Sequence, residues 1–280
     1  MLGRKESRPA EGPQLRIWPA ALEGYRFTLR NAGTALRLIL LPALCITGVH
    51  FALFGFEAPA EEPEASLGLA LSGLGETVVA ILLITMVLVA WQRRILLGSE
   101  QAKMRFGRRE GRMLVALLVL GLMIALLTVV LMLVAIVVAV SGAEAVINAL
   151  DIAAKLGTAY LTGRFYFVLP PRAMDRKLSF AEAWRMSAGH GKSLMAIVVL
   201  VGAPVVILSN VVAEAAAVSL ESGAIGMLAG ASLLGNVLFM LGIVVEAAAM
   251  TFCYAALGGY RHIMEARGVD PAPEPEAAPA

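Results

Sequence analysis

Five polar residues follow one another at steps of three and four inside an otherwise apolar stretch. They are Asn148, Asp151, Lys155, Thr158 and Thr162. This spacing places all five on one face of a helix. Asp151 precedes Lys155 by four residues, which is the favourable order for an ion pair on a helix. A charge at membrane depth costs roughly 3 kcal/mol on insertion scales, so such a pair is a strong candidate for either chemistry or architecture.

Glu246 is the other charged candidate within an apolar stretch. A rise of about 1.5 Å per residue puts Glu246 about 18 Å, and Lys155 about 21 Å, from the predicted cytoplasmic ends of their helices. One hypothesis is a polar cavity in which Lys155 binds an anionic group or balances a titrating Glu246. The other hypothesis is a structural ion pair of Lys155, with Asp151 or with Glu246, that holds the helices together.

The sequence also lacks the complete pattern for a phosphate-binding loop and for a histidine metal site. Residues 189–193 look like the end of a phosphate-binding loop, but the required glycine is replaced by Met186. The histidines are far apart in the sequence and have no metal-ligand spacing. They are His50, His190 and His262. We therefore predict no metal site, no cofactor and no catalytic residue, which means that the protein is not an enzyme.

The basic residues are segregated, because 22 of the 23 Lys and Arg residues lie in four blocks and Lys155 is the exception. The blocks run from Arg4 to Arg37, Arg93 to Arg112, Arg164 to Lys192, and Arg261 to Arg267. Basic segments beside a membrane attract anionic lipid headgroups, and no nucleic acid is needed to explain them. The predicted headgroup contacts are Arg26, Arg30, Arg93, Arg94, Arg108, Arg109, Arg185 and Lys192.

The composition is that of a membrane protein. Hydrophobic residues make up 59% of the 280 residues and charged residues 16%, whereas soluble domains have about 25% charged residues. The apolar runs reach the roughly 20 residues that a spanning helix needs, and they are apolar all round. We predict an all-α polytopic membrane protein with six transmembrane helices in three hairpins. The predicted spans are residues 35–56, 74–92, 112–140, 144–169, 192–219 and 224–257.

The charge segregation predicts the orientation. Connections on the other side contain no Lys or Arg, so the positive-inside rule places the basic blocks and both termini in the cytoplasm of a bacterial inner membrane. Amphipathic surface helices are predicted on that side, at residues 19–31 and after Ser179, where Glu182 completes a capping box. The tryptophans fall near the same interface, as in an aromatic belt. They are Trp18, Trp91 and Trp184.

We predict one domain, residues 14–262, between disordered segments at 1–13 and 263–280. Residues 23–26 align with residues 182–185 at an offset of 159. The suggested repeat unit is a surface helix followed by two spans, with residues 95–112 as a degenerate middle copy. The alternative is that any basic amphipathic segment before a span looks similar.

Small residues recur at four-residue spacing on the sixth predicted span. The pairs are Gly226 with Gly230 and Ala231 with Gly235. Such spacing lets helix backbones approach closely. It predicts tight packing there, either within the chain or in a homo-oligomer.

Three segments, residues 91–98, 164–170 and 178–184, carry a resemblance to a known family. Together with the hairpin order, they resemble the multi-span membrane domain found beside some bacterial glycerophosphodiester phosphodiesterases and in related inner-membrane proteins. The resemblance covers most of residues 15–262 and implies the membrane fold. It brings no functional residues, and the chain has no room for the soluble phosphodiesterase barrel.

Two functions follow from these features. The first is a non-enzymatic protein that organises or modulates the envelope through contact with membrane lipids, as the basic blocks and surface helices indicate. The second is a small-solute or lipid transporter with a polar site around Lys155, Asp151 and Glu246. A membrane-embedded enzyme is disfavoured, because no cluster of His, Asp or Ser stands at the membrane edge.

Overall fold

The structure, a computed structural model, describes residues 15–54, 66–98, 104, 106–139, 144–221 and 225–268. Every regular element among these residues is a helix, in agreement with the all-α prediction. The segment 1–13, predicted to be disordered, lies outside the described residues, as does the predicted tail beyond Gly268.

Five helices are long and apolar enough to cross a membrane. They are α2 (Ala32–Phe54), α3 (Ser66–Leu97), α4 (Arg108–Ala139), α8 (Gly191–Glu221) and α9 (Ile225–Tyr254). Each overlaps a predicted span. Pro42 and Pro204 lie inside α2 and α8, as spanning helices tolerate.

The fourth predicted span, residues 144–169, differs from the other five. It consists of helix α5 (Glu144–Phe165) and a 3₁₀ turn, η3 (Tyr166–Val168). Helix α5 is long enough to span, but it is not among the helices whose composition is apolar enough. Asn148, Asp151 and Lys155 lower its mean hydropathy, so composition supports five spans where the sequence analysis predicted six.

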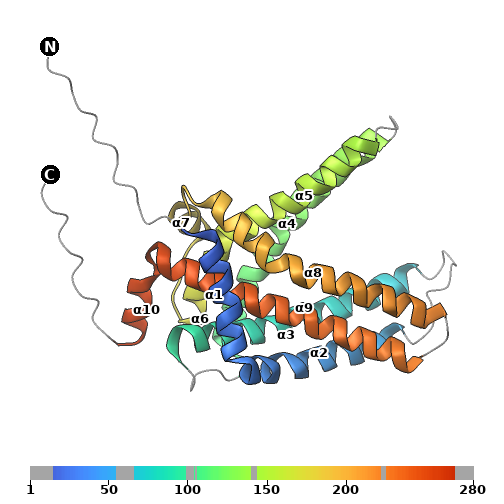
Figure 1. The fold of residues 1–280 in the computed structure, drawn as a ribbon, viewed down its shortest axis with the longest axis horizontal. Helices are drawn as coiled ribbons and strands as arrows, with labels where there is room; N and C mark the ends of the chain where they lie inside the picture. The colour runs from blue at the N-terminus through green and yellow to red at the C-terminus, as the bar shows by residue number, and fades with distance from the viewer. Residues whose placement is uncertain are drawn as a thin grey trace, which may run out of the picture.

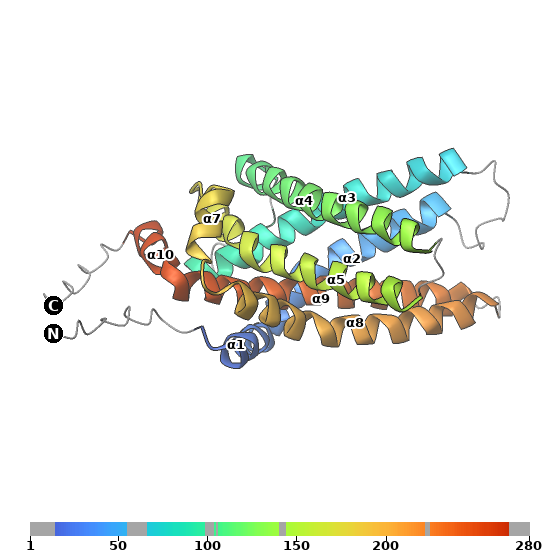
Figure 2. The ribbon, with the colours of Figure 1, turned by 90° about the horizontal axis from the view of Figure 1, so that it is seen from above.

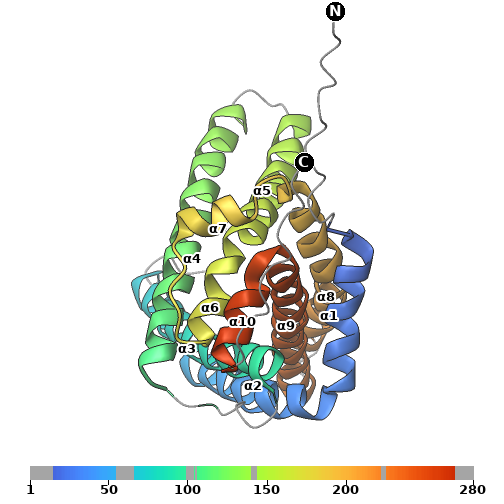
Figure 3. The same cartoon turned by 90° about the vertical axis from the view of Figure 1, so that its left-hand side faces the viewer.

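Helix α9 is the centre of the arrangement. It packs against α2, α3 and α8, and the short helix α1 lies across it (Figures 1 and 3). Helix α2 also packs along α3, and α4 packs along α5. The α4–α5 pair joins the rest through α3 on one side and α8 on the other, and it diverges from the other long helices along its length (Figure 1).

The tightest core lies where α3, α9, η3 and α8 meet. Trp91 of α3 is fully buried there, and its indole Nε1 donates a hydrogen bond to the Val244 carbonyl oxygen at 2.8 Å. Phe167 of η3 and Tyr254 of α9 are also fully buried, with ring centroids 5.9 Å apart. Trp91 is therefore a core residue rather than part of the predicted aromatic belt.

The short helices gather at one end of the molecule, called the basic end below (left in Figure 1, facing the viewer in Figure 3). They are α1 (Ile17–Arg30), α6 (Leu169–Ala173), α7 (Phe180–Met186) and α10 (Tyr260–Ala266). Figure 2 shows that all the long helices extend from this end in one direction. Helix α10 follows a π turn, η4 (Ala255–Gly259), and buries Ile263 against the core. Residues 263–266, which the sequence analysis placed in the C-terminal segment, lie within this helix.

Helix α1 is held against α9 by a face of small residues. Ala21, Gly24 and Thr28 are buried, whereas Leu29 is 73% exposed. A Cβ atom on Gly24 would lie 2.7 Å from the Cβ of Ala249, so only glycine allows this approach. The predicted surface helix is therefore present, but it packs through its small residues rather than through a stripe that includes Leu29.

The starts of two long helices agree with the internal repeat. Helices α2 and α8 begin at Ala32 and Gly191, which differ by the offset of 159 residues. The hydroxyl of Thr28 donates to the carbonyl oxygen four residues earlier at 2.9 Å, and Ser187, its repeat partner, does the same at 2.9 Å. The surface helices differ in length, with 14 residues in α1 and seven in α7.

Candidate functional site

The polar residues of α5 lie on a face that the rest of the chain leaves open. Lys155 Nζ donates to Asp151 Oδ2 at 2.6 Å, and the two side chains are 75% and 57% exposed. Asn148 is exposed as well, whereas Thr158 and Thr162, nearer the basic end, are half-buried. The structure thus brings Asp151 and Lys155 together, in the order that the sequence predicted, but exposes the pair.

Glu246 lies in a different environment. It is half-buried on α9, within electrostatic range of Tyr166. Within the described part of the chain, no ion pair joins it to Lys155. The hypothesis that Lys155 balances Glu246 therefore has no contact to support it.

A buried polar group beside Glu246 was not anticipated from the sequence. Gln92 of α3 is fully buried, and its Nε2 donates to the Tyr166 hydroxyl at 3.3 Å. Gln92 Oε1 is buried and has no hydrogen-bond partner among the described residues. A glutamine inside an apolar run, directly after Trp91, is the signal that could have identified it.

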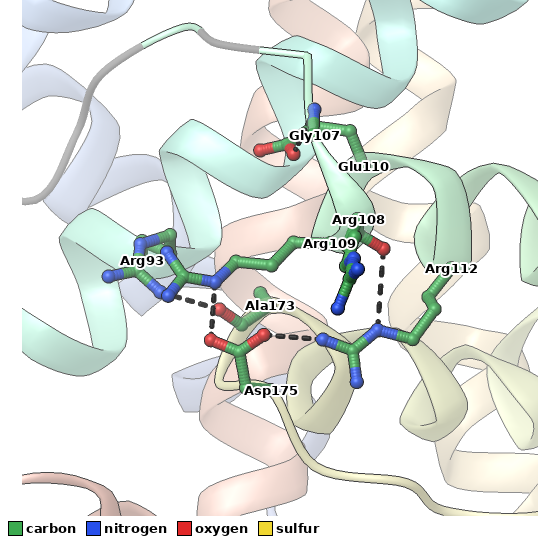
Figure 4. A network of polar contacts seen from close by, with 8 residues as sticks. All are labelled: Arg93, Gly107, Arg108, Arg109, Glu110, Arg112, Ala173 and Asp175. Atoms are coloured by element: carbon green, nitrogen blue, oxygen red, sulfur yellow. Dashed lines mark hydrogen bonds and ion pairs between the residues drawn. The ribbon is translucent and has the colours of Figure 1, made fainter.

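An arginine network organises the basic end around Asp175 (Figure 4). Asp175 follows α6 with a φ of 65°, and its carboxylate forms ion pairs with Arg109 and Arg112. Arg93 donates to the Ala173 carbonyl oxygen at 2.9 Å, and Arg172 donates to the Arg112 carbonyl oxygen at 2.7 Å. The network therefore joins the end of α3 and the start of α4 to the segment around α6.

Burial lowers the pKa of one arginine in this network. Desolvation is the main cause of the lowered pKa of the Arg172 guanidinium, and the neighbouring charge of Arg112 is the second cause. The sequence analysis missed Asp175 and Arg172. The available signal was that Asp175 is one of only two acidic residues in the basic block 164–192.

Arg164 ties the end of α5 to α7 and the start of α8. It is buried, and its guanidinium donates to the Ser187 hydroxyl at 2.8 Å and to the Tyr160 hydroxyl at 3.0 Å. The same group lies 3.5 Å from the centre of the Trp184 ring and donates to the Trp184 carbonyl oxygen. This arginine is a structural cross-link rather than a free cation.

The eight predicted headgroup contacts divide into two sets. Three are held by the protein: Arg93 and Arg109 in the Asp175 network, and Arg94, which donates to Asn31 Oδ1 at 2.8 Å. The other five are exposed and form no hydrogen bond or salt bridge through their side chains in the described part of the chain. These five, called the free cations below, are Arg26, Arg30, Arg108, Arg185 and Lys192.

Exposed apolar surface lies at the same end of the molecule as the free cations. Trp18 is 65% exposed and Trp184 39% exposed. A groove of about 430 Å³ between α4, the end of α5 and α7 is lined by apolar side chains, with Arg185 at its edge. Its other lining residues are Met123, Phe165, Phe180, Ala181 and Trp184. Cations beside exposed aromatic rings and an apolar groove match the chemistry of a phospholipid, which has an anionic head and apolar tails.

A capping box fixes the segment that carries this groove. The Ser179 backbone amide donates to Glu182 Oε2 at 2.7 Å, and the Glu182 amide donates to Ser179 Oγ at 3.2 Å. The backbone and side-chain hydrogen bonds from Ser179 lower the pKa of Glu182. The capping box that the sequence predicted is confirmed.

Two other expectations concern metal and nucleotide binding. Among the residues that the structure describes, no group of three or more His, Cys, Asp or Glu side chains lies close enough to hold a metal ion. Residues 189–193 form the turn between α7 and the start of α8, with Gly189 at a φ of 79°. Lys192 points outward from that first turn as one of the free cations.

Comparison of the chain with protein-family models, with curated proteins and with solved structures gives no match. The resemblance to the phosphodiesterase-associated membrane domain therefore stays a prediction.

Proposed function

We propose that the chain is a six-span protein of the bacterial inner membrane, in which α5 crosses the membrane as the fourth span and both termini lie in the cytoplasm. Helix α5 has 22 residues, or about 33 Å of helix, and packs along the apolar helix α4. Three helix pairs, α2–α3, α4–α5 and α8–α9, then form three hairpins. The gathering of the basic residues at one end supports a cytoplasmic basic end.

Labelling from one side of the membrane tests this topology. Lys177 is exposed after α5, and Arg108 is exposed at the start of α4. If both α4 and α5 cross the membrane, Lys177→Cys and Arg108→Cys react with an impermeant thiol reagent from the same, cytoplasmic side. Reaction from opposite sides would exclude α5 as a span.

We further propose that the protein is a non-enzymatic, lipid-contacting protein that organises or modulates the envelope. The observation that carries this proposal is the apolar α7 groove, lined by Trp184 and Arg185, at the end of the molecule that also carries the other free cations. Other arginines at the basic end, such as Arg93, Arg94 and Arg109, are bound by groups of the protein itself. The five free cations keep their charge available to anionic headgroups. No nucleic acid is needed as a partner, and protein partners are not identified by this surface.

Native mass spectrometry with added lipids tests the proposal. Purified protein is expected to retain phosphatidylglycerol or cardiolipin in preference to zwitterionic phosphatidylethanolamine. Neutralising the exposed cations with Arg26→Gln, Arg30→Gln and Arg185→Gln should remove the preference. The matched control keeps the charge with Arg26→Lys, Arg30→Lys and Arg185→Lys and should retain it. Equal retention of both lipid classes by the wild-type protein would refute lipid recognition by this surface.

Transport of a small solute or a lipid is the second candidate. It is favoured by the buried pair of Gln92 and Tyr166 beside the half-buried Glu246, because Gln92 Oε1 lacks a partner among the described residues. Buried polar groups inside a bundle mark many substrate or ion pathways. Proteoliposomes that carry wild-type protein or Glu246→Gln would test it, and equal proton and lipid flux in both would count against transport through this group.

A further inference from the structure

The polar face of α5 follows a heptad pattern. Its five residues, called the α5 seam below, are Asn148, Asp151, Lys155, Thr158 and Thr162. In a heptad written abcdefg, Asn148, Lys155 and Thr162 take a positions, and Asp151 and Thr158 take d positions. Alternating steps of three and four are the spacing by which two parallel helices pack against each other.

Packing within the chain uses other faces of α5. A Cβ atom on Gly157 would lie 3.1 Å from Leu127 of α4, so Gly157 marks the face toward α4. A Cβ atom on Gly163 would lie 3.1 Å from the Leu194 backbone, so Gly163 marks the face toward α8. At about 100° per residue, the seam falls on a third face, where Asn148, Asp151 and Lys155 are exposed and Thr158 and Thr162 are half-buried.

The exposure of this face is unusual for its depth. Lys155 lies about 16 Å from the start of α5 and about 15 Å from its end, which is near the middle of a span. Its side chain is 75% exposed, that of Asp151 is 57% exposed, and the Asn148 amide forms no hydrogen bond within the described residues. Charged side chains at this depth face protein or water rather than lipid. The exposed seam therefore calls for a cover that the single chain does not supply.

We propose that the α5 seam pairs with the α5 seam of a second copy of this chain, in a parallel two-fold dimer within the membrane. The charges on one seam complement the charges on its copy. In parallel packing, an a residue enters a hole that includes the preceding d residue of the facing helix. Lys155 of each copy therefore meets Asp151 of both copies, and two cations and two carboxylates form one neutral cluster.

The same symmetry satisfies the polar residues above and below the charges. Asn148 occupies an a position, where a buried asparagine pairs with its copy and specifies a two-stranded register. Thr158 and Thr162 are small enough to let the two helices approach and can donate hydrogen bonds across the interface. An unrelated membrane protein would have to supply matching charges at matching depths, whereas a second copy supplies them by symmetry.

The shape of the molecule makes the seam accessible. The α4–α5 pair diverges from the other long helices, so its outer part stands apart from the α8–α9 pair (Figures 1 and 3). A two-fold axis along the membrane normal keeps both copies in the same orientation. The proposal depends on α5 crossing the membrane, but it does not depend on lipid recognition at the basic end.

Disulfide cross-linking of the full chain tests the dimer. The background carries Cys45→Ala and Cys253→Ala, and the protein is reconstituted at low density in phosphatidylethanolamine vesicles. Oxidation should cross-link Asn148→Cys and Thr158→Cys into dimers. The control is Ala153→Cys, because Ala153 is exposed at the same depth but lies on the opposite side of α5. No cross-linking at the seam positions, or equal cross-linking at Ala153→Cys, would overturn the proposal.

Exchanging the charges of Asp151 and Lys155 tests whether this ion pair contacts the same ion pair in a second copy of the chain. Asp151→Lys gives a seam with two cations, and Lys155→Asp gives a seam with two carboxylates. In the Asn148→Cys background, each variant alone should lose the cross-linked dimer, and co-expression of the two should restore it as a heterodimer. If mixing restores nothing, the pair acts only within one chain and the proposal fails. The vesicles contain no anionic lipid, so failure of lipid recognition would leave this result unchanged.

Discussion

The α8–α9 and α4–α5 pairs are both built from long packed helices, yet they relate to the rest of the protein in opposite ways. Helix α9 is enclosed by α1, α2, α3 and α8, and an almost continuous run from Val244 to Met250 is buried. Helix α4 is the most apolar of the five spanning candidates, yet it is the least buried. Hydropathy therefore does not predict which helix lies at the centre.

The difference follows from the solvent. In a membrane, an apolar side chain gains little by leaving lipid for protein, so close packing and polar contacts decide which faces meet. Around α9, close approaches at Gly24 and Gly242 and the Trp91 hydrogen bond supply such contacts. In α4–α5, the polar residues face outward instead. The α5 seam is thus the face on which the molecule remains open to a partner.

The largest effect is expected from breaking the central packing. Trp91→Ala removes a fully buried ring and its hydrogen bond to the Val244 carbonyl. The free energy of unfolding should fall by about 3–5 kcal/mol. Leu133→Ala on α4, where the side chain is 59% exposed, should change it by less than about 0.5 kcal/mol. Denaturant titration in detergent micelles measures both. Equal losses of unfolding free energy would mean that Leu133 of α4 is packed as tightly as Trp91 of α3.

Arg164 offers the next test, because it joins α5 to the segment that leads into α8–α9. Arg164→Met removes its hydrogen bonds to Ser187, Tyr160 and the Trp184 carbonyl. Hydrogen bonds to a buried charged group are worth about 1.5–3 kcal/mol, and we expect a loss in that range. The control Arg185→Met changes an exposed arginine at the same end and should cost much less. A small loss for Arg164→Met would show that the two pairs dock without this cross-link.

Substitutions at two glycines allow the packing inside the α8–α9 pair to be compared with that inside the α4–α5 pair. A Cβ atom on Gly242 of α9 would lie 2.9 Å from Val205 of α8, and a Cβ atom on Gly157 of α5 would lie 3.1 Å from the tip of Leu127 of α4. Val205 is stiff at χ1, whereas the end of Leu127 can turn away. Gly242→Ala should therefore lower the free energy of unfolding by about 1 kcal/mol through overpacking.

Gly157→Ala should leave the free energy of unfolding unchanged or raise it slightly, because alanine favours the helix. Thermal unfolding of the two variants side by side gives the difference. If Gly157→Ala is the more destabilising, the α4–α5 pair is the more rigidly packed of the two.

Much of the fold could be predicted from the sequence, because long apolar runs have few alternatives in a membrane. Five of the six predicted spans overlap helices that are long and apolar enough to cross a membrane, and the remaining one, residues 144–169, overlaps α5. The repeat offset of 159 residues reappears in the starts of α2 and α8. What failed depends on tertiary contacts. Trp91 was assigned to the interface by its type, yet it is buried by neighbours distant in sequence.

The residue types of the candidate site could be predicted from the sequence, but the partner of each side chain could not. The sequence identified the basic residues, but a basic block does not reveal which members are paired. Arg109 is paired because Asp175, 66 residues away, adopts a positive φ after α6 and reaches it. The sequence also placed Asp151 with Lys155 correctly, but the direction in which that face points depends on how α5 docks on α4 and α8.

The smallest effect concerns the capping box at α7, where the two pairs meet at the basic end. Hydrogen bonds from Ser179 lower the pKa of Glu182 in the folded protein. Its contribution to stability is therefore fully present above the ordinary glutamate pKa and is lost as the pH falls through the lowered, folded pKa. Amide hydrogen exchange in α7 should speed up over that acidic window, relative to the intrinsic rate, in the wild-type protein.

The matched variant for this test is Glu182→Gln, which retains a side-chain acceptor but has no charge to lose. Its α7 exchange, corrected for the intrinsic rate, should not respond to the same acidic window. If wild-type protein and variant respond alike, the acid sensitivity of α7 comes from another group. The α7 groove would then be held by Arg164 and its contacts with Trp184 and Ser187 rather than by the cap, and the junction between the two helix pairs would depend on that single arginine.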